Sequence, residues 1–151
     1  MRTIRTDNMN EEFEKIIKGK ICPYCNCKTK LVSGEIIYPE KLNEVPRPKY
    51  LDKIFYQCIN DANHYVGTYG DNLTSLGRLA DTELRRWKNK GHNTFDPLWK
   101  EHKIFKSQKE AYIWLSEKMK LPLGFTHFGM FTIEQCKEAI EFCEELKKGH
   151  Q

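Results

Sequence analysis

The stretch "KICPYCNCK", residues 20–28, contains half of the chain's six cysteines. Its Cys22-Pro23-Tyr24-Cys25 motif fits either the dithiol of a glutaredoxin-like enzyme or the first ligand pair of a zinc site. A redox dithiol lies at the start of a helix, whose N-terminus stabilises the thiolate. The residues that follow, "NCKTKLVSGEIIY", are rich in Asn, Thr, Ser, Gly and β-branched types, which predict strands. The context therefore favours a zinc site.

A zinc site needs two further ligands, and Cys58 and His64 supply them six residues apart. Three thiolates and one imidazole are a common tetrahedral ligand set that leaves no open coordination position, so we predict one structural Zn²⁺ ion. A small β-rich module depends on such an ion to fold. Cys27 stays an alternative fourth ligand in place of His64.

Composition limits the class of protein to which the 151-residue chain can belong. Charged residues make up 30%, the formal net charge is +4, and the mean hydropathy is −0.70. No apolar run approaches the roughly 20 residues of a membrane span. The N-terminal "MRTIRTDNMNEEFEKIIKGK" lacks the apolar stretch of a signal peptide. We expect a cytoplasmic protein without membrane association, in which cysteines are thiols or metal ligands.

The elements that position these ligands are short strands. Residues 28–38 predict two strands around Ser33-Gly34, and residues 54–59 and 64–69 predict two more. Residues 39–53 contain three prolines and predict an exposed loop. Upstream, residues 9–19 predict a short helix.

The pattern after residue 72 is helical. Helix starts are predicted by Asp81, by Asp96 before Pro97, and by the capping boxes Ser107–Glu110 and Thr132–Gln135. In the last helix Cys136 and Cys143 are spaced as core residues. We expect an α+β fold in which a small zinc-ribbon β-hairpin module is followed by a three- to four-helix α segment. The predicted parts are an N-terminal helix or tail (1–19), a zinc ribbon (20–72) and a helical domain (73–151).

Positive charge is concentrated in the middle of the chain. Residues 83–110 hold eight Lys and Arg against four Asp and Glu, an excess of +4 that equals the net charge of the whole chain. This bias indicates a phosphate-facing surface, with a solvated helix face as the open alternative. For nucleic-acid contacts we expect the side chains of Tyr56, Tyr65, Tyr69, Arg85, Arg86 and Lys88.

Histidines in the helical part raise the question of catalysis. His92, Asp96, His102 and His127 are residue types that a small metal-dependent nuclease or hydrolase uses. Asp96 is explained by helix capping, and the segment shows no spacing of nucleophile, base and stabiliser. We therefore expect a non-catalytic protein. Whether His92, Asp96 and His127 form a site or only pack stays open.

Two resemblances follow from longer motifs. The segments "CPYCNCKTKLVSGEIIY" and "FYQCINDANHYVGTY" resemble the C-terminal zinc ribbons of type IA DNA topoisomerases over about a third of the chain. In this chain His64 stands where those ribbons have a last cysteine, and residues 39–53 are an insertion. The resemblance implies binding of single-stranded DNA.

The second resemblance covers residues 22 to about 146. The runs "LGRLADTELRRWKNKGHNTFDPLWK", "SQKEAYIWLSEKM" and "HFGMFTIEQC" are similar to an uncharacterised family of short zinc-finger-containing proteins of phages and bacteria. This similarity implies the zinc site and the architecture, and no catalytic residues. We expect an accessory factor that binds single-stranded or structured nucleic acid. A protein–protein adaptor, or a phage-type modulator of a host factor, is the alternative. DNA versus RNA and the oligomeric state stay open.

Overall fold

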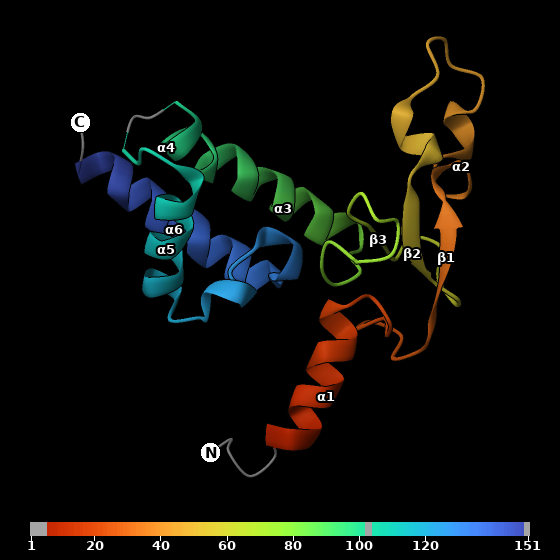
Figure 1. Ribbon diagram of the computed structural model, residues 1–151, viewed down its shortest axis with the longest axis horizontal. Coiled ribbons are helices and arrows are strands. Elements are labelled where there is room, and N and C mark those ends of the chain that lie inside the picture. Colours follow the sequence, from red (N-terminus) through yellow and green to blue (C-terminus); the bar gives the residue numbers. More distant parts are fainter. Residues whose placement is uncertain (1–5, 102–103, 150–151) are drawn as a thin grey trace. The chain divides into compact units, whose positions relative to one another are not determined.

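The computed structural model describes residues 6–101 and 104–149 of the chain (Figure 1). By their internal contacts the residues divide into two compact units, Met1–Thr82 and Glu83–Gln151. We call them the sheet unit and the helical unit. Strands and helices together confirm the predicted α+β class. No helix in the described part of the chain has the length and apolar character that crossing a membrane requires.

The sheet unit is built on one antiparallel sheet of order β1-β2-β3. Its elements are helix α1 (Thr6–Ile17) and strands β1 (Thr29–Ser33), β2 (Ile54–Cys58) and β3 (Tyr65–Gly67). Alternate residues of a strand point to opposite faces. Tyr56, Cys58 and Val66 therefore share one face, and Phe55 and Tyr65 share the other.

The face with Tyr56 is the core of the sheet unit. Cys22, Tyr56, Cys58, Val66 and Leu79 are buried together there. The Tyr56 hydroxyl donates a hydrogen bond to the Leu73 carbonyl at 2.6 Å and accepts one from Lys20 Nζ at 2.9 Å. Because its side chain is 3% exposed, the prediction that Tyr56 stacks on a base is wrong.

Residues 34–53 differ from the prediction. Strand β2 begins at Ile54, which pairs with Ser33, so the chain beyond Ser33 has no strand to pair with. It turns instead into the short helix α2 (Gly34–Ile37). The predicted loop 39–53 contains two 3-10 turns, Pro39–Lys41 and Lys49–Asp52, and buries Leu51 completely.

Residues 73–82, predicted to belong to the helical domain, lie in the sheet unit. Ser75 bridges to Thr68 and Ala80 to Tyr65, extending the pairing of β3. Ser75 Oγ also donates a hydrogen bond to the Ile17 carbonyl at 3.0 Å, which ties the end of α1 to this segment.

The helical unit contains α3 (Thr82–Phe95), α4 (Pro97–Lys100), α5 (Gln108–Met119) and α6 (Ile133–Gly149). Both predicted capping boxes start helices. Ser107 Oγ accepts a hydrogen bond from the Glu110 N–H, and the Thr132 and Gln135 side chains each accept one from the other's backbone. Asp96 departs from the prediction, because its backbone is already helical and its carboxylate caps nothing. That carboxylate lies 3.4 Å from His92 Nδ1.

Aromatic rings fill the core of the helical unit. The Phe128 ring lies 5.9 Å from that of Phe95 and 5.1 Å from that of Phe131. Cys136 and Cys143 are fully buried, which confirms that they are core residues. Burial raises the pKa of the Cys143 thiol to about 12, so it remains a neutral, apolar group.

Gly91 in α3 makes this packing testable. A Cβ atom there would lie 2.2 Å from Cε1 of the buried Phe128 ring. Alanine favours a helix over glycine by about 1 kcal/mol, but overpacking a core costs about 1–3 kcal/mol. We expect Gly91→Ala to lower the midpoint of thermal unfolding. Gly149→Ala is the control, because nothing lies within 4 Å of a Cβ there. A Gly91→Ala midpoint at or above that of the control would contradict the packing described.

Candidate metal centre

The first ligand-bearing turn spans residues 22–27. The Cys22 N–H donates to the Cys27 carbonyl at 2.8 Å, and the Asn26 N–H donates to the Cys22 carbonyl at 2.8 Å. The turn closes through Asn26 at φ 55°, a left-handed conformation that asparagine tolerates better than most residues. These bonds place Cys22 and Cys25 on one tight turn.

The second ligand-bearing turn joins the end of β2 to the start of β3. The Cys58 N–H donates to the His64 carbonyl at 2.9 Å, which closes the loop at its base. The backbone N–H groups of Asn60 and Asp61 both donate to Cys58 Sγ at 3.3 Å. The loop thus fixes the Cys58 sulfur and stabilises it as a thiolate.

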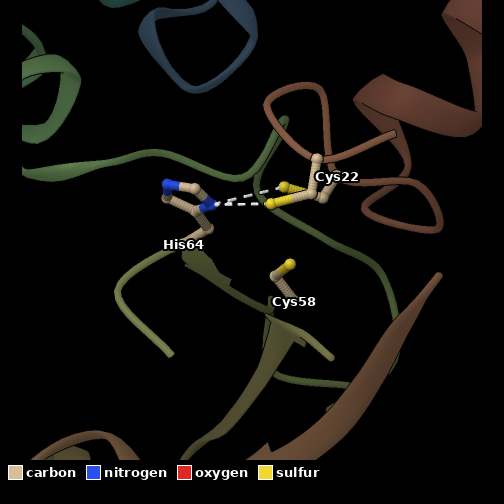
Figure 2. A group of neighbouring side chains, drawn as sticks. Cys22, Cys58 and His64 are labelled. Atoms are coloured by element: carbon tan, nitrogen blue, oxygen red, sulfur yellow. Dashed lines mark hydrogen bonds between the residues drawn. The ribbon is translucent and has the colours of Figure 1, made fainter. Parts of the chain in front are cut away.

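The two turns bring four donor atoms together. His64 Nδ1 lies 3.5 Å from Cys22 Sγ and 3.7 Å from Cys25 Sγ, and these atoms and Cys58 Sγ all lie within 4.8 Å of one another. Figure 2 shows the His64 ring directed at the Cys22 sulfur, with the Cys58 sulfur beside them. Ligands about 2.0–2.3 Å from a tetrahedral zinc ion are roughly 3.3–3.8 Å apart. The donor set and its spacing therefore fit one Zn²⁺ ion.

Asp61 and Tyr24 hold the imidazole in this orientation. Asp61 Oδ2 lies 3.5 Å from His64 Nε2, the ring nitrogen on the side away from the sulfurs. The Tyr24 ring packs against the imidazole at 4.4 Å between centroids. A carboxylate on the second nitrogen of a ligating histidine sets its tautomer and strengthens it as a ligand. Sequence reasoning missed both residues, although Asp61 stands three positions before His64.

The thiols differ in acidity without a metal. Burial works to raise the pKa of Cys58, but the backbone donors and the Cys27 thiol outweigh it and lower this pKa to about 6. The hydrogen bond with Cys58 raises the pKa of Cys25 to about 12, and burial raises that of Cys22. One thiolate, on Cys58, is therefore present at neutral pH, and the other two ligand thiols carry protons.

These residues define a small protein stabilised by one structural zinc ion. The family described as a zinc-finger-containing domain matches residues 18–146, and the chain belongs to this family. Neither the curated proteins nor the solved structures searched contain a match to the chain.

The histidines of the helical unit do not form a comparable group. The His92 ring packs on Phe128 at 4.9 Å, and the His127 ring packs on Tyr112 at 5.5 Å. Burial lowers the pKa of His127. Among the residues that the structure describes, three or more His, Cys, Asp and Glu donors converge only at the sheet-unit site. His102 lies outside the described residues.

The residues predicted to contact nucleic acid differ in their exposure. Tyr69 is 52% exposed, whereas Tyr65 is half-buried beside Phe55 and Tyr38. In α3, Arg86 is exposed and Arg85 is half-buried. Lys88 Nζ donates a hydrogen bond to the Gly129 carbonyl at 3.0 Å. No sequence motif predicted this last contact.

Zinc affinity should depend on pH through these thiols. Zinc binds thiolates, so binding at neutral pH must release the protons of Cys22 and Cys25. Because two protons are released, we expect the apparent association constant for zinc to rise by about two decades per pH unit between about pH 7 and 8.5. Competition against a chelator of known pH-dependent affinity measures this slope. An association constant that does not change over this interval would contradict the protonation states derived above.

Proposed function

We propose that the chain is a non-catalytic, cytoplasmic accessory protein that binds single-stranded or structured nucleic acid. The observation that carries the proposal is a cationic and aromatic surface on the helical unit. Lys90 Nζ from α3 and Lys137 Nζ from α6 each lie 5.1 Å from the centre of the Trp87 ring. Arg86 is exposed one position before that tryptophan. We call Arg86, Trp87, Lys90 and Lys137 the Trp87 patch.

The cations of the Trp87 patch are available to an anionic ligand. In the described part of the chain, Arg86, Lys90 and Lys137 form no ion pair with a carboxylate. Lys90 and Lys137 are exposed and Trp87 is half-buried. The two ammonium groups can attract the phosphate of a nucleotide. The indole beside them can stack on its base.

The sheet unit supplies a second set of exposed rings. Tyr69 is 52% exposed, and Tyr50 is 37% exposed beside Tyr38, with 4.8 Å between their ring centroids. Stacking of a base on such a ring contributes about 1–3 kcal/mol. The resemblance to topoisomerase zinc ribbons supports single-stranded DNA as the ligand class. In addition to the Trp87 patch, the candidate contacts include Tyr65, Tyr69, Arg85 and Lys88.

A protein–protein adaptor is the second candidate. It is favoured by apolar side chains that the sheet unit leaves in solvent near Tyr69, since Leu73 is 57% exposed and Leu76 40% exposed. Leu76 also covers Gly67 at the end of β3. Apolar groups of this kind form protein interfaces more readily than phosphate-binding surfaces. A metal-dependent nuclease has no comparable support in the described residues.

Fluorescence anisotropy of the zinc-loaded protein tests the proposal. Labelled single-stranded DNA, duplex DNA and RNA would be titrated at about 50 and 150 mM salt. We expect binding to weaken as salt rises, because each phosphate contact to a single strand contributes about −0.7 to the slope of log K against log salt. The double variant R86E/K90E should bind at least about tenfold more weakly and show a shallower slope.

The matched control is K109E/K148E, which makes the same change in charge at two exposed lysines of the helical unit outside the patch. It should retain most of the affinity. Absence of binding at low salt, or equal losses in both double variants, would contradict the proposal. The exposed leucines would then become the next surface to test against protein partners.

A further inference from the structure

A fifth donor atom lies beside the four zinc ligands. Cys27 Sγ is 3.3 Å from Cys58 Sγ, and the Cys27 side chain packs against the same buried cluster while remaining partly exposed. The four-donor group of Cys22, Cys25, Cys58 and His64 does not include it. Cys58 therefore has a sulfur neighbour that the zinc site does not use.

Cys27 lies at the distance of a fellow ligand from one member of the zinc site, Cys58. Two sulfurs bound to one tetrahedral ion are roughly 3.7 Å apart, and the distance from Cys27 to Cys58 is close to this value. The backbone also directs Cys27 to the centre. Its carbonyl accepts a hydrogen bond from the Cys22 N–H at 2.8 Å, which ties Cys27 to the turn that carries Cys22 and Cys25.

We infer that Cys27 replaces His64 as a ligand when the centre holds a thiophilic divalent cation such as Cd²⁺. The centre then has two overlapping ligand sets that share Cys22, Cys25 and Cys58. Zinc, of borderline softness, takes the imidazole, whereas a softer ion gains more from a fourth thiolate. The all-sulfur set carries one more negative charge than the set with His64, since a thiolate replaces a neutral ring.

Cadmium-113 NMR of the full-length protein, with ¹⁵N-labelled histidine, tests this directly. In the wild type we expect the bound cadmium to show no scalar coupling to His64. In Cys27→Ser the fourth thiolate is gone, so coupling to His64 Nδ1 should appear. Coupling in the wild type that Cys27→Ser leaves unchanged would overturn the inference.

A zinc-binding cycle gives an independent readout. Apparent zinc affinities would be compared for wild type, Cys27→Ser, His64→Ala and the double variant. We expect Cys27→Ser to stay within about threefold of wild type, since zinc uses His64. When His64 is absent Cys27 takes its place, so the double variant should lose at least about tenfold more than the product of the two single effects. The overlap of the two ligand sets would be refuted if the double variant lost zinc affinity only by the product of the two single losses. A large loss of zinc affinity in Cys27→Ser alone would refute it as well.

Discussion

Coordination of one zinc ion by Cys22, Cys25, Cys58 and His64 is the interaction on which the sheet unit depends. The first pair precedes β1, and the second pair connects β2 to β3, so the ion lies at the end of the sheet where β1 and β3 begin and β2 ends. The apolar core beside it is small. Structural zinc contributes about 10–16 kcal/mol in small domains, which is comparable to the whole stability of a typical protein.

The electrostatics of the centre follow from the same arrangement. Without an ion, only Cys58 has a pKa low enough to be a thiolate at neutral pH, because the loop's N–H groups point at its sulfur. The thiols of Cys22 and Cys25 lose their protons at neutral pH only when the positive charge of a metal ion stabilises the thiolates. Asp61 adds a carboxylate behind the imidazole, so the histidine presents its Nδ1 lone pair to the sulfurs.

The sequence predicted those features that depend on local spacing. The zinc ligands follow from the Cys-x-x-Cys motif with Cys58 and His64, and the capping boxes place the starts of α5 and α6 within one or two residues. Features set by distant segments could not be predicted. Strand β1 ends at Ser33 because its partner Ile54 is the first residue of β2, so residues 34–37 have no strand to pair with and form a helix.

Surface properties were the least predictable, for the same reason. Alternation placed Tyr56 and Phe55 on opposite faces, but the packing of Cys22 and of residues 73–80 determines that the Tyr56 face is buried. Trp87 and Lys137 are 50 residues apart, and their proximity depends on how α3 packs with α6. The charge bias of residues 83–110 includes Arg86 and Lys90 of this patch, whereas Lys137 lies outside it.

The most direct test of the zinc-centred account is the metal content of the protein, followed by two-dimensional amide NMR before and after zinc is removed with a chelator. The account predicts one zinc ion per chain. On chelation it predicts loss of dispersed signals from residues 20–82, while the signals of the helical unit, which has its own aromatic core, persist. A sheet unit that keeps its dispersed signals without metal would contradict the claim that zinc holds it together.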